Sequence, residues 1–208
     1  MPFLAQSEII LFQGDSITDC KRDRADIASL GTGYPLLAAS YLASRADKDL
    51  TFINKGISGN RAGDLVERWQ QDCIDLQPTV VSVLIGINDV WRRYKPEPDP
   101  TSVEDYKARY ESILTRTKHE LGAKMVILEP FLLPVSEDFK RWREDLDPKI
   151  QAARALARAF DALYIPLDGI FAAACAKKPP EYWAADGVHP TIAGHGLIAD
   201  AWVRAVSG

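Results

Sequence analysis

The sequence has few cysteines and no long apolar run, and both shortages limit what the protein can be. Cys20, Cys73 and Cys175 lie far apart and none belongs to a C-x-x-C pair, so we expect reduced thiols, no disulfide framework and no metal site. No apolar stretch reaches the roughly 18 residues of a membrane helix. The residues from Met1 onward lack the basic and apolar regions of a signal peptide, so we expect a cytoplasmic protein that does not act at membranes.

Blocks of positive charge and phosphate-binding loops are missing as well. The formal net charge is −4, and Arg92-Arg93 and Lys177-Lys178 are pairs rather than blocks, so nucleic acid is not an expected partner. The glycines of residues 31–33 (GTG) lack the third glycine of G-x-G-x-x-G, and no G-x-x-x-x-G-K-[ST] occurs. A nucleotide-binding domain is therefore disfavoured.

The pattern of apolar residues predicts an α/β protein. With 208 residues, of which 47% are hydrophobic and 26% charged, the chain fits one domain over residues 1–208 with a substantial core. We expect strands at residues 9–12, 50–54, 79–85, 124–129 and 162–167. We expect helices at residues 34–46, 62–76, from Thr101 (with Glu104 as a capping box) to about 121, 148–160, 170–176 and 191–206, with an irregular segment at 131–145. Strands alternating with helices predict a three-layer α/β/α sandwich around a five-stranded parallel sheet, in the flavodoxin-like order 2-1-3-4-5.

A serine stands where the first apolar run stops. Residues 8–19 read EIILFQGDSITD, so Ser16 follows a buried strand and a tight turn. In an open α/β sheet the functional site lies beyond the carboxyl ends of the strands. Ser16 is therefore either a nucleophile or a helix-cap residue, since serine is common at caps.

Attack of a hydroxyl on a carbonyl needs a base, a group that orients the base, and donors for the oxyanion. His119 lies among charged residues and is expected to be solvated, while His195 lies inside the last helix and is expected to be structural. His189 differs, because Pro190 disfavours helix at the preceding residue and displays the imidazole from a loop. Asp186, three residues earlier, is able to orient that imidazole. A turn role for Asp186 and a helix-entry role for His189 are the structural alternatives.

Two residues at other strand ends are candidate oxyanion donors. Gly59 offers a backbone N–H after the second strand, and Asn88 offers a side-chain amide after the third. Both residue types are also common in turns, which is the alternative. Ser16, Gly59, Asn88 and the Asp186/His189 pair all follow the carboxyl ends of one predicted sheet, where we expect them to converge.

Four blocks in this order resemble the SGNH (GDSL-type) hydrolases. They are residues 14–17 (GDSI), 54–60 (NKGISGN), 86–89 (GIND) and 186–189 (DGVH), with Ile17 where leucine is often found. The resemblance implies Ser16 as nucleophile, His189 as base and Asp186 as its orienting carboxylate. It also implies an oxyanion hole of the Ser16 and Gly59 N–H groups with the Asn88 amide, and no cofactor or metal. The G-x-S-x-G elbow of α/β-hydrolases is absent from the sequence.

Longer strings resemble the subgroup of this family that deacetylates sugars, including acetylxylan esterases. These strings are NKGISGN, IGINDVWR and VHP-x-x-AGH. They imply a serine esterase that removes acetyl groups from acetylated sugars or xylo-oligosaccharides through an acyl-enzyme, with a small acetylated molecule as substrate. Trp91 and Trp183 flank the proposed site and are expected to stack on sugar rings, with ordinary packing as the alternative.

Other readings of the sequence stay open. Arg22, Arg61 and Arg92 either line the mouth of the site or are solvated surface residues. A thioesterase or lysophospholipase acting on longer acyl chains is the alternative enzyme, and a carbohydrate-binding protein without catalysis is the alternative outside enzymes. The sequence does not fix the oligomeric state, so a homo-oligomer is left open.

Overall fold

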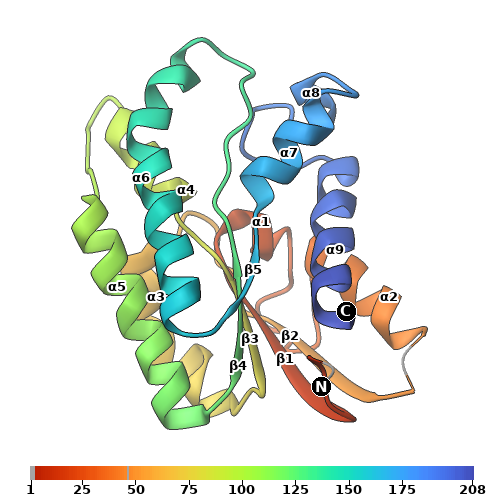
Figure 1. The fold of residues 1–208 in the computed structure, drawn as a ribbon. Helices are drawn as coiled ribbons and strands as arrows, with labels where there is room; N and C mark the ends of the chain where they lie inside the picture. The colour runs from red at the N-terminus through yellow and green to blue at the C-terminus, as the bar shows by residue number, and fades with distance from the viewer. Residues whose placement is uncertain (1–2, 46) are drawn as a thin grey trace.

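Five parallel strands form one sheet in the computed structural model, which describes residues 3–45 and 47–208 (Figure 1). The order is β2-β1-β3-β4-β5, which confirms the predicted flavodoxin-like arrangement. The strands are β1 (Ser7–Gly14), β2 (Asp49–Asn54), β3 (Val80–Leu84), β4 (Lys124–Leu128) and β5 (Leu163–Ile165).

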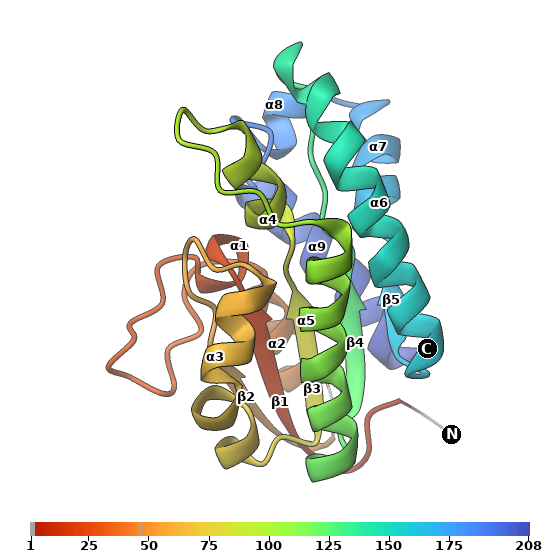
Figure 2. The same cartoon turned by 90° about the vertical axis from the view of Figure 1, so that its left-hand side faces the viewer.

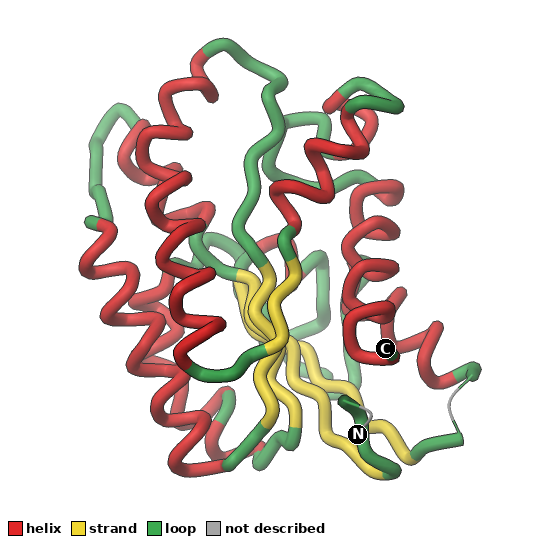
Figure 3. Tube along the Cα trace, in the orientation of Figure 1, coloured by secondary structure: helices red, strands yellow, loops and turns green. Residues whose placement is uncertain are grey.

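The register brings the carboxyl ends of neighbouring strands level. Gly14 at the end of β1 lies opposite Leu84 at the end of β3, and Phe12 lies opposite Asn54 at the end of β2. All five residues of β3 are buried, as expected for a central strand covered on both faces. Since the strands end together, the loops that follow them start side by side at the upper edge of the sheet (Figure 3).

Helices cover both faces of the sheet. α2 and α9 pack together on one face, and α3, α5 and α6 cover the other (Figures 1 and 2). The helices are α1 (Ser16–Asp19), α2 (Tyr34–Ala43), α3 (Ala62–Asp72), α4 (Ile87–Trp91), α5 (Val103–Arg116), α6 (Asp138–Ala159), α7 (Leu167–Cys175), α8 (Pro180–Trp183) and α9 (Ile192–Ser207), with short helical turns η1 (Ile74–Leu76), η2 (Arg92–Tyr94) and η3 (Thr117–Leu121). No helix within the described ranges has the length and apolar character needed to cross a membrane.

A fully buried tryptophan lies in the core on each side of the sheet. Trp202 on α9 donates its indole N–H to the hydroxyl of Ser82 on β3 at 3.0 Å. On the opposite side, Trp69 on α3 donates to the hydroxyl of Thr117 at 3.2 Å. Both indoles are buried with their polar hydrogen satisfied, so neither carries a desolvation cost for an unpaired donor.

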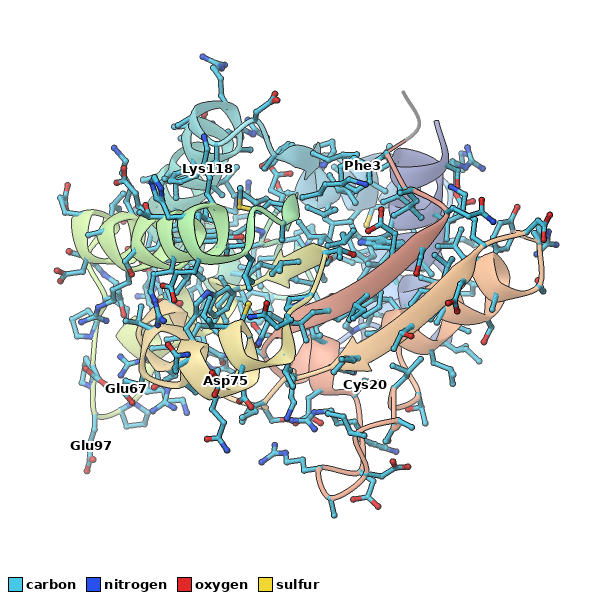
Figure 4. The ribbon with its side chains drawn as sticks, turned by 90° about the horizontal axis from the view of Figure 1, so that it is seen from below. Phe3, Cys20, Glu67, Asp75, Glu97 and Lys118 are labelled. Carbon is cyan, nitrogen blue, oxygen red and sulfur yellow. The ribbon has the colours of Figure 1, made fainter. Side chains whose placement is uncertain are left out.

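The lower edge of the sheet is the amino-terminal edge. Figure 4 views the molecule from this side and labels Phe3, Asp75 and Lys118, which precede β1, β3 and β4. The loops that carry the candidate site residues leave the other edge, so the site lies at the far end of the strands from these residues.

The irregular segment predicted for residues 131–145 is wrong in its second half. α6 begins at Asp138 and continues through Pro148 to Ala159, whereas the sequence predicts a helix from 148. Trp142, Leu146 and Ile150 are spaced four residues apart and are all buried, and this apolar stripe holds the helix together across the exposed proline. The usual rule that proline starts or breaks a helix is therefore overridden by packing.

Several predicted element ends also differ. The predicted capping box of Thr101 and Glu104 is wrong, because the hydroxyl of Ser102 caps α5 by accepting the N–H of Asp105 at 3.0 Å. α2 ends at Ala43 rather than at the predicted Ala46, which lies outside the described residues. The four-residue helices α1 and α8 were not predicted, since so short a segment shows no periodicity.

Ile192 on α9 and Tyr41 on α2 are large apolar side chains that are exposed to solvent. Ile192 is 86% exposed, because it starts the first turn of α9 on the solvent side while Gly194 and His195 face inward. Tyr41 on α2 is 48% exposed and its ring lies under the guanidinium of Arg45.

Candidate active site

Ser16 is placed by a turn that only glycine permits. A Cβ atom at Gly14 would stand 2.3 Å from the carbonyl oxygen of Leu84, so a side chain there would push β1 and β3 apart. Asp15 then caps α1, its Oδ1 accepting the N–H of Ile17 at 3.0 Å. The cap is Asp15 and not Ser16, so the alternative of Ser16 as a cap residue is wrong and its hydroxyl is free for another partner.

That partner is His189. The Oγ atom of Ser16 lies 2.9 Å from Nε2 of His189, and Nδ1 of His189 lies 2.6 Å from Oδ2 of Asp186. The other carboxylate oxygen of Asp186 accepts the backbone N–H groups of Val188 (3.0 Å) and His189 (2.7 Å). Three groups from opposite ends of the chain thus form one continuous line of hydrogen bonds.

The protonation of this line follows from its donors and acceptors. Burial acts most strongly on the pKa of Asp186 and would raise it, but the hydrogen bonds from the His189 side chain and from two backbone N–H groups together lower the pKa below its usual value. An ionised carboxylate can only accept, so Nδ1 of His189 carries the proton. Nε2 is then the acceptor that faces the hydroxyl of Ser16.

Gly59 and Asn88 lie at the same edge of the sheet. Gly59 has φ +84°, a left-handed conformation that favours glycine, and a Cβ there would stand 4.0 Å from Nη2 of Arg92. Asn88 in α4 donates one amide hydrogen to the carbonyl of Asn60 at 3.1 Å, which leaves the other hydrogen available. In the described part of the chain, the N–H groups of Ser16 and Gly59 donate to no other backbone group.

A cluster of aromatic rings, those of Trp91, Trp142 and Tyr94, lies beside His189. The ring of Trp91 lies 5.9 Å from the imidazole and 5.7 Å from the ring of Trp142, and Tyr94 stacks on Trp142 at 5.2 Å. Trp142 and Tyr94 were not predicted as part of the site, because Trp142 lies in the segment expected to be irregular. Trp183 packs edge-on against Tyr182 at 5.0 Å instead of against the imidazole.

The fold is found in known proteins. The model of the GDSL-like lipase/acylhydrolase family matches residues 12–197. The chain belongs to this family. It is therefore a carboxylic ester hydrolase, as the four sequence blocks predict.

Individual relatives of this GDSL hydrolase agree with the family assignment. A curated acetylxylan esterase from Geobacillus stearothermophilus is 33% identical over 211 residues, which cover 98% of this chain and 95% of the relative. The crystal structure of Axe2, an acetylxylan esterase from the same organism, matches with a TM-score of 0.89 and 32% identity, covering 97% of this chain and 94% of Axe2. LAE5, a hydrolase from the metagenome of Lake Arreo, matches with a TM-score of 0.91 and 31% identity over 99% of this chain and 98% of its own.

Arg68 of the GDSL hydrolase supports the loop that carries Gly59, and nothing in the sequence pointed to it. Its guanidinium donates to Oδ1 of Asn60 at 2.8 Å and to Oε1 of Gln13 at 3.0 Å, and it pairs with Asp72 at 3.0 Å. Since Asn88 donates to the carbonyl of Asn60, Arg68 fixes the position of both candidate oxyanion donors. Sequence periodicity places this arginine on a helix face, but its partners Asn60 and Gln13 lie outside that helix.

His195 connects the serine side of the site to α9. Its Nδ1 accepts the backbone N–H of Tyr34 at 3.1 Å, so Nε2 carries the proton and donates to Sγ of Cys20 at 3.3 Å. Burial, together with the nearby charge of His189, lowers the pKa of His195 to about 4, so the imidazole is neutral near pH 7. The structural role predicted for His195 is confirmed, and the exposed position of His119 also agrees with its predicted solvation.

Within residues 3–45 and 47–208, no group of three or more His, Cys, Asp or Glu side chains is arranged to hold a metal ion. Two acidic side chains are instead buried singly under the site. Burial raises the pKa of Asp15 to about 7 and that of Asp89 to about 6. Asp89 accepts the N–H of Ala62 at 3.1 Å, which ties α4 to the start of α3.

Substituting Asp15 by asparagine is expected to change how stability depends on pH. Between about pH 4 and pH 7 the folded protein keeps a proton on Asp15 that the unfolded chain releases, so this residue makes the free energy of unfolding fall as pH rises through that window, by on the order of 4 kcal/mol. Asparagine retains the oxygen that accepts from Ile17 and has no proton to lose. Urea denaturation should therefore show that the free energy of unfolding of Asp15→Asn, relative to that of the wild type, increases by a few kcal/mol from pH 5 to pH 8.

The matched control for this prediction is Asp26→Asn. Asp26 makes the same kind of bond, its Oδ1 accepting the N–H of Ala28 at 2.9 Å, but it is exposed. Its stability difference from the wild type should not vary with pH. An Asp15→Asn difference that is equal at pH 5 and pH 8 would show that Asp15 is ionised in the folded protein.

Proposed function

We propose that this GDSL hydrolase is a serine esterase that removes acetyl groups from acetylated sugars such as xylo-oligosaccharides. The observation that carries the proposal is the unbroken line of hydrogen bonds from Asp186 through His189 to Ser16. The similarity to an acetylxylan esterase from Geobacillus stearothermophilus supports the acetyl group and the sugar.

In the proposed reaction, Oγ of Ser16 attacks the acetyl carbonyl while Nε2 of His189 takes the serine proton. The negative charge of Asp186 stabilises the imidazolium that forms. The imidazolium then gives its proton to the departing sugar oxygen, which leaves an acetylated serine. Water activated by the same imidazole attacks this ester, acetate leaves, and the proton returns to Ser16.

Three donors are placed to receive the oxyanion. The N–H of Ser16 is the first of α1 and has no partner within its own helix, as for every helix start. The N–H of Gly59 and the second amide hydrogen of Asn88 complete the proposed set. Each such donor contributes on the order of 3 kcal/mol to the stability of the transition state.

The leaving sugar is proposed to lie against Trp91. His189 must protonate the sugar oxygen, and the Trp91 ring is 5.9 Å from that imidazole, so a ring attached to this oxygen comes within stacking reach. Trp183, three residues before Asp186, remains a proposed second contact. The alternative of a long acyl chain, as in a thioesterase or lysophospholipase, would need an apolar pocket at Ser16.

A substrate panel tests the proposal. We expect kcat/KM for p-nitrophenyl acetate to exceed that for p-nitrophenyl octanoate at least about tenfold, and acetylated xylo-oligosaccharides to be cleaved. Trp91→Ala is expected to raise KM for the oligosaccharides about 3- to 10-fold, whereas Tyr41→Ala, which removes an exposed ring from α2, should not. Preference for the octanoate would favour the long-chain alternative. Sugar binding without turnover would favour a binding protein.

A further inference from the structure

Arg92, at the edge of the site, has neither an acidic partner nor a side-chain hydrogen bond within the described residues. Arg92 starts η2 directly after α4, which lies beside α1 above the ends of the strands (Figure 2). Apart from Gly59 and its two chain neighbours, the Nη2 atom of Arg92 is the one heavy atom of the described residues within 4 Å of the position that a Cβ on Gly59 would occupy, at 4.0 Å. The space over Gly59 is therefore open, and the guanidinium of Arg92 forms one of its borders.

The other arginines around the site have partners. Arg61 pairs with Asp99 at 2.9 Å, Arg93 pairs with Asp145 at 3.4 Å, and Nε of Arg22 donates to the carbonyl of Gly56 at 2.8 Å. Throughout residues 3–45 and 47–208, no carboxylate oxygen lies within 4.0 Å of the Arg92 guanidinium. Glu97, on the loop that follows η2, points away from the molecule (Figure 4).

Such a group is suited to bind an anion. Arg92 is partly buried, so part of its side chain packs against the protein. A guanidinium presents a planar fork of donors that matches a carboxylate in two parallel hydrogen bonds. Because the protein as a whole carries a formal charge of −4, a local positive group is needed to receive a negatively charged substrate.

Arg92 is also aligned with the residues proposed to contact the substrate. Asn88, Trp91 and Arg92 are at positions i, i+3 and i+4 of one helical segment, so they lie on one face. Asn88 is proposed to meet the carbonyl oxygen, and Trp91 the sugar beside His189. Arg92, over Gly59, then faces a substituent carried close to the scissile ester.

From this arrangement we propose that Arg92 forms an anion subsite and that the preferred substrates are acetyl esters of sugars bearing a carboxylate, that is, acetylated uronic acid residues. This proposal rests on the proposed function. A carboxylate near the ester could also belong to the acyl part, as in a hemiester of a dicarboxylic acid. The acetyl group itself carries no charge, so the sugar is the source of the anion in our assignment.

The test compares charged and neutral partners in two pairs. The first pair is a monoacetylated methyl glucuronoside and the corresponding monoacetylated methyl glucoside, and the second is p-nitrophenyl hemisuccinate and p-nitrophenyl butyrate. For the wild type we expect kcat/KM to be at least about tenfold higher for the acidic sugar than for the neutral one, through KM, with the ratio falling as NaCl rises from low to high concentration. Arg92→Gln is expected to lower that ratio by about 10- to 30-fold, and Arg92→Lys by less, since lysine keeps the charge but not the fork.

The matched control is Arg45→Gln, since Arg45 follows α2 and lies over Tyr41. It should leave the ratio unchanged. Equal loss on both sugars in Arg92→Gln would overturn the anion subsite, and an acidic preference confined to the hemisuccinate would overturn the assignment to the sugar. A wild type that cleaves p-nitrophenyl acetate but neither sugar ester would instead contradict the proposed function, so the two failures are distinguishable.

Discussion

Replacing Ser16 with alanine is expected to lower kcat for p-nitrophenyl acetate by about 10⁴-fold or more while the protein stays folded. The substitution removes the only protein atom that bonds to the acyl carbon in the proposed mechanism. It leaves intact the cap of α1, which is made by Asp15 and Ile17. The hydroxyl of Ser16 has Nε2 of His189 as its partner, so the fold loses one hydrogen bond at a partly exposed position.

Steady-state kinetics measures the loss of kcat, and urea denaturation of the same samples shows whether the protein stays folded. The matched control is Ser44→Ala, which deletes a serine hydroxyl bonded to the carbonyl of Tyr41, away from the site. It should retain wild-type kcat. If Ser16→Ala kept more than about a tenth of the activity, another group would have to supply the nucleophile and the line of hydrogen bonds would be incidental to catalysis.

The sheet could be predicted from the sequence because its signal is local. β3 is a short apolar run between turn residues, and such a run predicts a central buried strand without knowledge of its partners. The alternation with helices predicted a parallel sheet with right-handed connections, and the flavodoxin-like order was chosen among the orders compatible with it. α6 could not be predicted across Pro148, since the contacts that favour the longer helix come from side chains packed against it by the rest of the fold.

The positions of the proposed catalytic and oxyanion residues could be predicted from the sequence, but the residues that surround them could not. Ser16, Gly59, Asn88 and His189 stand directly after strands or in a loop marked by proline, so their positions follow from chain order and the parallel sheet. The structure brings Ser16 and His189 together although 173 residues separate them.

Arg68, His195 and Arg92 act through partners on other elements. Arg68 holds Asn60, His195 joins Cys20 to Tyr34, and Arg92 borders Gly59. No periodicity in the sequence encodes contacts of this kind, because each depends on the angle at which two elements meet. Residue type alone therefore gave Arg68 no role, left Arg92 open between the mouth of the site and the solvated surface, and gave His195 a structural role.

Asp186 shows how one atom of a carboxylate decides the chemistry of the imidazole. Its Oδ1 organises the loop through two backbone N–H groups, and its Oδ2 faces Nδ1 of His189 at 2.6 Å. In an asparagine the amide oxygen would keep the backbone bonds, so the NH₂ group would stand where Oδ2 does. An NH₂ group only donates, and it would require Nδ1 to be the acceptor. The single proton of the neutral imidazole would then move to Nε2, where it blocks transfer from Ser16.

Asp186→Asn is therefore expected to lower kcat about 10⁴-fold near pH 7 with little change in the free energy of unfolding. Steady-state kinetics gives the first quantity and urea denaturation the second, and ¹⁵N chemical shifts of His189 report which ring nitrogen carries the proton. Asp200→Asn is the matched control, since Asp200 is an exposed acid on α9 paired with Arg204 and its loss should leave kcat unchanged. Retained activity together with a proton on Nε2 would show that His189 is not the base. Loss of activity with the proton still on Nδ1 would mean that the charge of Asp186 matters more than its orienting hydrogen bond.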